Sequence, residues 1–332
     1  MLFAVASDSQ PELSIVISTL GNHALLRRVL DGYERQTASP ASFEVLVVAD
    51  RVEPDPAAVH AAVGERPYEV RILSGKLPGL SANRNVGWRA ARAPVVLFTD
   101  NDTIPIPALV REHLAWHRRW PAQEVAVVGL VRWAPGVKVT PFMRWLEHGV
   151  QFDFHSIPGS EASWAHLYGA NSSIKRGLLE RVGGYDEERL PYGYEDLDWG
   201  YRAREHGLRV LLNRAAVVDH WRPMTIEDWQ VRAPRLAVSE WRFCQLHPDI
   251  PPWFQRKFAD AAAQPPGGGR SAAALRFVPE RTPWIGPRLF SRADLYWRQQ
   301  IAPHFLAAWE QAAAGHPPEL EPGAAALAER SG

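Results

Sequence analysis

The sequence has one cysteine, no net charge and no long apolar run. Because Cys244 is its single cysteine, the chain forms no internal disulfide framework, which fits a reducing compartment. Lys plus Arg and Asp plus Glu both number 37, so bulk charge gives no reason to expect a nucleic-acid partner. No apolar run approaches the roughly 20 residues that span a bilayer, and the N-terminus lacks the basic segment and apolar core of a signal peptide. We therefore expect a cytoplasmic protein.

The glycine-rich phosphate-binding motifs are missing as well. The chain contains neither G-x-G-x-x-G nor G-x-x-x-x-G-K-[ST]. If a diphosphate binds, a metal ion must therefore neutralise most of its charge. Arg84, within "SANRN", is a candidate helper because a guanidinium pairs with phosphate through two hydrogen bonds. A solvated position on a helix is the alternative for a lone arginine.

The first half of the sequence alternates two hydrophobic periods. Short apolar runs predict buried strands at 13–19, 43–50, 68–73 and 94–100. Apolar residues spaced by three and four predict helices at 23–36, 79–92 and 107–120. Alternating strands and helices predict an α/β fold in which a doubly wound, mostly parallel sheet carries helices on both faces.

The second half is less regular. We expect strands at 124–133 and 208–221, a strand followed by a turn at 164–176, and a helix at 195–207. From about residue 223 the pattern becomes helical, with a flexible insert near 261–274. We therefore divide the chain into a sheet domain (1–222), a helical extension (223–320) and a disordered tail (321–332).

Two acids follow the predicted strand at 94–100. Asp100 and Asp102 lie on the same side if the strand continues through them. Two carboxylates that close repel each other, and the pKa of each would rise unless a cation lay nearby. Mg²⁺ or Mn²⁺ would bind both carboxylate oxygen and the phosphate oxygens of a substrate. A solvated turn in which Asp102 caps the next helix explains the pair equally well.

A second acidic cluster begins the predicted helix at 195–207. Glu195 and Asp196 stand where carboxylates meet the free N–H groups of a helix start, and helix capping alone would explain one such acid. The neighbouring aromatic side chains, Tyr194 and Trp199 among them, make the segment resemble a carbohydrate pocket. His220 ends the predicted strand at 208–221 and is a metal-ligand candidate only because Asp102 suggests a metal.

Taken together, these segments resemble the family 2 glycosyltransferases, which are inverting nucleotide-sugar enzymes of GT-A fold. The similarity covers about residues 12–222 and rests on "LSIVIST", "FEVLVVAD", "GLSANRNVGWRAARAPVVLFTDND", "YGANSSIKRGLLERVGGYDE" and "GYEDLDWGYRAREHG". The last two segments also resemble the C-terminal half of galactosyltransferase-type catalytic domains. On this resemblance residues 1–222 form the nucleotide-sugar-binding and catalytic domain, whereas the helical extension matches no known motif.

The resemblance implies a role for each matching residue. It implies that the nucleotide is contacted by Thr19, Asp50, Arg84 and Asp100. It implies metal ligation by Asp102 and His220, general-base catalysis by Asp196 and an acceptor-binding neighbour in Glu195. We expect acceptor contacts from Gly169, Asn171, Ser172, Tyr194 and Trp199.

The predicted function is metal-dependent, inverting transfer of a sugar from a nucleotide-sugar donor to an acceptor hydroxyl. Mn²⁺ or Mg²⁺ is the expected cofactor and UDP the favoured nucleotide, with GDP or dTDP as alternatives. The acceptor classes are a carbohydrate, a lipid-linked sugar, a peptide and a small molecule. Two alternatives stay open: a haloacid-dehalogenase-like phosphatase using Asp100 and Asp102, and a non-catalytic protein that binds nucleotide sugars or carbohydrates. The Trp- and Arg-containing extension suits a homodimer contact, a peripheral membrane contact or a helical cap over the sheet.

Overall fold

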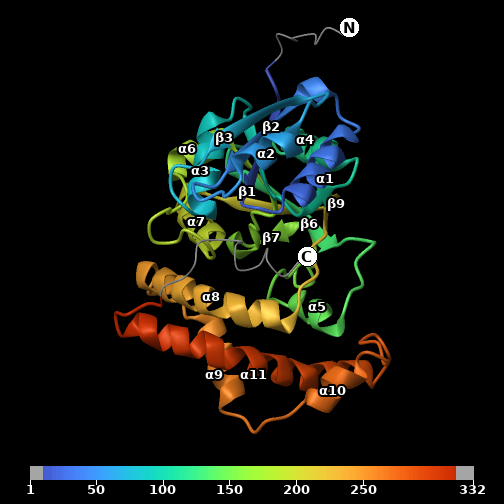
Figure 1. Ribbon diagram of the computed structural model, residues 1–332, viewed down its shortest axis with the longest axis vertical. Coiled ribbons are helices and arrows are strands. Elements are labelled where there is room, and N and C mark those ends of the chain that lie inside the picture. The colour runs from blue at the N-terminus through green and yellow to red at the C-terminus, as the bar shows by residue number, and fades with distance from the viewer. Residues whose placement is uncertain (1–9, 319–332) are drawn as a thin grey trace.

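The computed structural model describes residues 10–318 and shows a single sheet covered by helices, with a second, helical layer below it (Figure 1). The strands are β1 (Leu13–Thr19), β2 (Phe43–Ala49), β3 (Glu69–Ser74), β4 (Val95–Asp100), β5 (Thr103–Pro105), β6 (Val125–Trp133), β7 (Glu161–Ala162), β8 (Asn171–Lys175) and β9 (Arg209–His220). Their order is β3-β2-β1-β4-β8-β6-β9-β5, and β7 pairs with β9. The predicted α/β fold is confirmed.

The sheet is parallel in its first half and mixed in its second. β3, β2, β1 and β4 run parallel, as the alternation of strands and helices predicts. β8 is antiparallel to both β4 and β6, β6 is parallel to β9, and β5 is antiparallel to β9. β1 is buried over nearly its whole length, because helices cover both faces of the sheet.

Helices surround the sheet and form the second layer. Those of the sheet layer are α1 (His23–Glu34), α2 (Pro56–Val63), α3 (Leu80–Ala90), α4 (Leu109–Arg119), α6 (Arg176–Val182) and α7 (Glu195–Ala203). The short helix α5 (Pro141–Leu146) packs on the second layer. The second layer contains α8 (Ile226–Leu246), α9 (Trp253–Ala262), α10 (Gly269–Ala274) and α11 (Gly286–Ala313). Short 3₁₀ turns are η1 (Pro40–Ser42), η2 (Trp164–His166) and η3 (Arg204–His206). Within residues 10–318, none of the helices combines the length and apolarity needed to cross a bilayer.

The two layers have separate hydrophobic cores. Strand residues and the inner faces of α1 and α3 form the first core. The second core joins α8, α9 and α11, and its large side chains include Trp229, Trp297 and Phe305. Trp145 of α5 belongs to this second core although it comes from the sheet half of the sequence. Figure 1 shows α8 lying between the sheet layer and α11, so α8 faces the carboxyl ends of the strands.

Two local predictions differ from the structure. The strand expected first within 164–176 comes second: η2 precedes β8, because the Asn171–Lys175 backbone pairs with β4. The insert expected to be flexible near 261–274 contains the end of α9 and all of α10, separated by a short loop. The tail predicted at 321–332 lies outside the described residues.

Candidate active site

The carboxyl ends of the parallel strands meet above two adjoining cavities. Strand register places Ser18 of β1 beside Asp100 of β4. A strand-end cavity of about 510 Å³ is lined by Thr19, Asp50 and Asp102, among others. A helix-side cavity of about 620 Å³ lies between the sheet and α8. Asp100 and Asp102 line both cavities and so mark the boundary between them.

Thr19 and Asp50 lie in the strand-end cavity, where the sequence places them. The Thr19 hydroxyl accepts a hydrogen bond from the amide of Asn101 at 3.1 Å. The Asp50 carboxylate accepts hydrogen bonds from the Gly79 N–H at 2.9 Å and from the Asn83 amide at 2.7 Å. Asp50 therefore fixes the loop that leads into α3 and closes one side of this cavity.

Arg84 joins the acids of β4 to those of α7. Its guanidinium Nη1 lies 2.8 Å from Glu195 Oε1 and 2.7 Å from Asp196 Oδ1. Nη2 lies 3.6 Å from Asp100 Oδ1. Arg84 is only 3% exposed, so it is a buried cation among carboxylates and not a solvated helix residue. Burial works to lower the pKa of Arg84, but these three carboxylates outweigh it and raise the pKa above its ordinary value.

Gly169 allows this arrangement because it has no side chain. A Cβ at this position would lie 2.3 Å from Nη2 of Arg84, which no real contact tolerates. The Gly169 N–H also donates a hydrogen bond to Asp196 Oδ2 at 2.8 Å. Gly169 therefore lines the helix-side cavity and helps to orient the Asp196 carboxylate.

Of the three carboxyl groups around Arg84, those of Asp100 and Glu195 have raised pKa values. Burial raises the pKa of Asp100 to about 6, with Arg84 acting against the shift. Burial, reinforced by the charge of Asp196, raises the pKa of Glu195 to about 7. Glu195 Oε2 is buried and has no hydrogen-bond partner among the described residues. A perturbed, incompletely paired acid lining a cavity is typical of a functional site.

In the described part of the chain, no side chain caps the N-terminus of α7 with a hydrogen bond. The Asp196 oxygens bond to Arg84 and Gly169, so this acid does not act as a helix cap. Tyr194, just before the helix, has a left-handed backbone with φ of 65°, which is rare for a bulky residue. Its hydroxyl donates to Glu240 of α8, whose carboxylate also accepts from the N–H of Phe254 at 2.7 Å. Glu240 thus connects the second layer to the acidic helix start.

Asp102 and His220 form the pair expected to hold a metal ion. Pairing of β5 with β9 brings Asp102 Oδ2 to 3.5 Å from His220 Nε2. The other ring nitrogen, Nδ1, lies 3.0 Å from the Arg222 carbonyl, which only accepts, so Nδ1 carries the hydrogen and Nε2 is free to bind a metal. Ala108 precedes α4, so Asp102 does not cap that helix.

These donors fit Mn²⁺ or Mg²⁺ only in part. Among residues 10–318 no group of three or more His, Cys, Asp or Glu side chains is arranged to hold a metal. A carboxylate and an imidazole supply two ligands, and diphosphate oxygens and water would supply the others. The residues therefore fit an ion that binds together with a phosphate-bearing ligand.

Three residues expected to contact the acceptor lie elsewhere. Asn171 is buried behind the cavity, where its amide donates to the carbonyls of Leu130 and Ala216 and bridges β6 and β9. Ser172 donates to the Tyr168 carbonyl at 2.6 Å. Trp199 is fully buried, because the inner face of α7 packs on the first core. The acceptor role predicted for these three is therefore corrected to a scaffold role, whereas Tyr194 does line the helix-side cavity.

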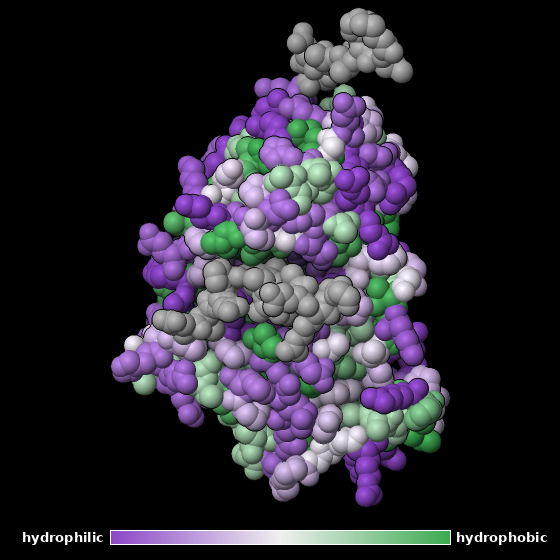
Figure 2. All heavy atoms as spheres, in the orientation of Figure 1, coloured by the Kyte–Doolittle hydropathy of each residue, from purple (hydrophilic) through white to green (hydrophobic). Residues whose placement is uncertain are grey.

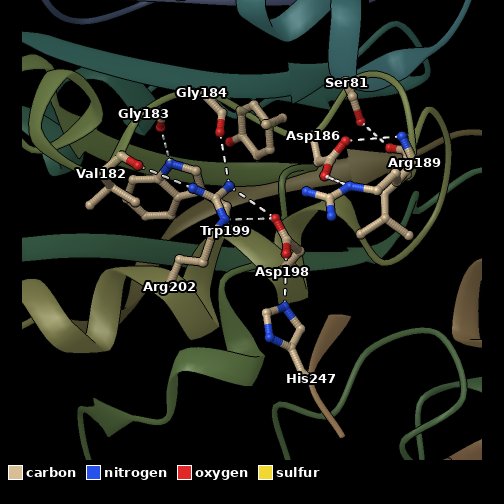
Figure 3. A network of polar contacts seen from close by, with 12 residues as sticks. Ser81, Val182, Gly183, Gly184, Asp186, Arg189, Asp198, Trp199, Arg202 and His247 are labelled. Atoms are coloured by element: carbon tan, nitrogen blue, oxygen red, sulfur yellow. Dashed lines mark hydrogen bonds and ion pairs between the residues drawn. The ribbon is translucent and has the colours of Figure 1, made fainter. Parts of the chain in front are cut away.

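Asp198, the third acid of α7, bonds to neighbouring side chains of the fold (Figure 3). Its carboxylate accepts from Arg202 Nε at 2.9 Å and lies 2.9 Å from His247 Nε2, at the end of α8. Arg202 donates in turn to the carbonyls of Val182 and Gly184. Figure 3 shows Asp198 between these two partners, so this acid ties α7 to the second layer.

The sequence missed the wall that the second layer contributes. From this layer Phe243, Trp253 and Phe254 line the helix-side cavity, opposite Phe152, Trp164 and Tyr168 of the sheet half. One signal was present, because Glu240 is an acid on the buried stripe of α8 that also carries Trp229, Ala233 and Leu236. Cys244 lines the cavity too, but burial raises the pKa of its thiol to about 11, so it is no nucleophile at neutral pH.

Comparisons with curated proteins find relatives that are longer than this chain. Validoxylamine A glucosyltransferase of Streptomyces hygroscopicus subsp. limoneus is 27% identical over 289 residues, covering 74% of this chain and 59% of the relative. Probable glycosyltransferase YdaM of Bacillus subtilis is 22% identical over 240 residues, covering 68% and 54%. The chain thus spans less than two thirds of the length of these relatives.

Solved structures share the fold at low identity. The mannosyltransferase PcManGT of Pyrobaculum calidifontis, in complex with GDP-Man and Mn²⁺, has a TM-score of 0.58 at 20% identity, covering 92% of this chain and 88% of that one. TarS of S. aureus, residues 1–349, has a TM-score of 0.52 at 15% identity, covering 92% of each chain. The predicted GT-A fold is confirmed. Residues 11–236 match the model of the family described as "Glycosyltransferase like family 2", which is more than half of the sequence, and the chain belongs to this family.

Proposed function

We propose that the chain transfers a sugar from a nucleotide-sugar donor, with a UDP-sugar favoured, to an acceptor hydroxyl, with inversion and with the help of a divalent metal ion. The observation that carries this proposal is the position of Arg84, which joins Asp100 at the boundary of the strand-end cavity to Asp196 in the helix-side cavity. A donor in the first cavity and an acceptor in the second would meet at these carboxylates. TarS structures with UDP and with UDP-GlcNAc, and PcManGT with GDP-Man and Mn²⁺, support this class of donor.

Each of the site residues has a separate role in the proposed sugar transfer. Asp196 accepts the proton of the acceptor hydroxyl, whose oxygen forms a bond to the anomeric carbon. The bond from that carbon to the diphosphate oxygen breaks on the opposite face, so the configuration inverts. Arg84 and the Gly169 N–H hold the Asp196 carboxylate in position through its two oxygens. Asp102 and His220 would hold the metal ion, which when bound neutralises charge on the leaving diphosphate.

The acceptor is a hydroxylated compound that packs against aromatic rings. Tyr168 and Phe254 line the helix-side cavity together with Asp196. Aromatic faces stack on the apolar faces of sugar rings, whereas carboxylates accept hydrogen bonds from hydroxyls. Carbohydrate, lipid-linked and glycosylated small-molecule acceptors share this chemistry.

The phosphatase alternative has little support from the site. A nucleophilic aspartate must present a free carboxylate, but Asp100 Oδ1 lies 3.6 Å from the Arg84 guanidinium, which also holds Glu195 and Asp196. Family membership also argues against it. The non-catalytic alternative keeps the same cavities and differs only in turnover, so binding and transfer have to be measured separately.

A thermal-shift panel of UDP-, GDP- and dTDP-sugars, with and without Mn²⁺, tests the proposed function. We expect one nucleotide class to raise the melting temperature only when Mn²⁺ is present, because ligand binding stabilises the folded state. Asp102→Ala should abolish the Mn²⁺-dependent shift. Asp219→Ala is the control, since this neighbouring β9 acid pairs with Arg132 and lines neither cavity. Equal shifts with and without Mn²⁺, or no shift with any donor, would contradict the proposal.

A further inference from the structure

The end of the second layer where α10 meets α11 exposes large apolar side chains. Phe277 is 86% exposed, Trp284 is 83% exposed and Ile285 is 56% exposed. Figure 2 shows hydrophobic surface beside strongly hydrophilic surface at this end of the molecule. Several large apolar side chains exposed on one short segment are typical of a surface that binds a partner or a membrane.

Arginines share this stretch of the sequence with the exposed apolar side chains. Residues 276–292 contain four arginines and one acid, in a chain whose net charge is zero. The four are exposed and form no ion pair among residues 10–318: Arg276, Arg281, Arg288 and Arg292. Some exposed arginines elsewhere do form ion pairs, as Arg118 does with Glu12 and Arg132 with Asp219. This Arg-aromatic surface, comprising Phe277, Trp284 and the four arginines, therefore holds positive charge that no neighbouring acid neutralises.

A tight turn presents Trp284 to solvent. Trp284 has a left-handed backbone with φ of 64°, which is unfavourable for a bulky side chain. The Gly286 N–H donates to the Thr282 carbonyl at 2.9 Å and closes the turn. A Cβ at Gly286 would lie 2.0 Å from the Glu280 carbonyl oxygen, so the loop folds closely onto the start of α11. The turn is thus built with a strained residue whose indole points outward.

We propose that the Arg-aromatic surface docks on the surface of an anionic phospholipid bilayer. Guanidinium groups attract the negative headgroups, while indole and phenyl rings enter the interface between headgroups and acyl chains. A second copy of this chain fits less well, because a two-fold contact would set the same unpaired arginines against each other. The proposal does not depend on the sugar-transfer reaction, so either can fail without the other.

Co-sedimentation of the full chain with vesicles tests the proposal. We expect binding to vesicles of phosphatidylcholine mixed with phosphatidylserine, weak binding to phosphatidylcholine alone, and loss of binding at high salt. Arg288→Gln with Arg292→Gln should weaken binding by about fivefold for each arginine. Phe277→Ser with Trp284→Ser should weaken it by about tenfold or more. Arg35→Gln with Arg118→Gln removes the same charge from the sheet layer and should leave binding unchanged.

Several results would overturn this inference. Binding that is equal for the wild type and for both surface variants would show that another part of the chain contacts lipid. Absence of binding to anionic vesicles would exclude a lipid partner. Sedimentation velocity that shows a dimer in the wild type and a monomer in Phe277→Ser with Trp284→Ser would assign the surface to a second copy instead.

Discussion

Asp196 Oδ1 lies 2.7 Å from the guanidinium of Arg84, although 112 residues separate them in the chain. The same guanidinium contacts Glu195 and faces Asp100, so one buried cation organises acids from β4 and from α7. Its burial means that these contacts exist in a low-dielectric environment, where orientation and charge matter more than at the surface.

Replacement of Arg84 by lysine keeps the charge but loses the planar group that contacts two carboxylates at once. We expect turnover to fall by about 100-fold or more, because Asp196 loses its fixed orientation. Steady-state release of nucleoside diphosphate measures this loss. Arg89→Lys on the exposed side of the same helix is the matched control and should behave like the wild type. Unchanged turnover in Arg84→Lys would show that the cluster needs only a positive charge.

Gly169→Ala tests the close approach between backbone and guanidinium. The new Cβ would lie 2.3 Å from Arg84 Nη2, which is too close, so the guanidinium must move. We expect turnover to fall by about 10- to 100-fold, while circular dichroism shows an intact fold. Gly159→Ala is the control, because a Cβ there meets no atom within 4 Å. If both alanine variants keep wild-type turnover, the approach of Gly169 has no catalytic consequence.

The raised pKa of Glu195 predicts a pH-dependent stability. Its pKa rises from 4.5 in the unfolded chain to about 7 in the folded protein, so the folded state binds the proton more tightly. The resulting stabilisation is complete below about pH 4.5 and is lost as the pH rises through about 7. Urea unfolding at several pH values should show that the wild type loses on the order of 1–3 kcal/mol relative to Glu195→Gln across this window. A constant difference between the two proteins would exclude the raised pKa.

Glu240 connects α8 to Tyr194, the strained residue that precedes α7. Its two oxygens accept hydrogen bonds from the Tyr194 hydroxyl and from the N–H groups of Phe254 and Gln255. Glu240→Gln replaces one acceptor with a donor that faces backbone N–H, so we expect a loss of about 2–4 kcal/mol in the free energy of unfolding. Glu227→Gln, exposed on the first turn of α8, should cost far less. Equal stability of the two variants would contradict this role of Glu240.

The sequence predicted most of the sheet but not the second layer's contribution to the site. β1, β2 and β4 lie where the apolar runs place them, because buried parallel strands have a composition that few other elements share. The wall of the helix-side cavity depends on how α8 packs across the strand ends. Such contacts are far apart in sequence and carry no motif, so only the acid on the buried stripe of α8, Glu240, hinted at them.

The positions of several site residues were predictable because they follow the ends of strands. Asp100, Asp102 and His220 converge as expected, because parallel strands end at one edge of the sheet. For Arg84 the sequence left open a phosphate contact and a solvated helix position, and the structure excludes the solvated position because Arg84 and most of the α3 residues around it are buried. The sequence could not show that Asn171 and Trp199 are buried structural residues. A polar or aromatic side chain can belong to a core as well as to a binding site, and periodicity does not distinguish the two.

The most direct test of the proposed mechanism compares binding and transfer in Asp196→Asn. With the donor identified by thermal shift, we expect this variant to keep the Mn²⁺-dependent stabilisation by nucleotide sugar and to lose transfer by about 100- to 10,000-fold, since only the proton acceptor has been removed. Transfer at the wild-type rate by Asp196→Asn would contradict the assignment of Asp196 as the general base.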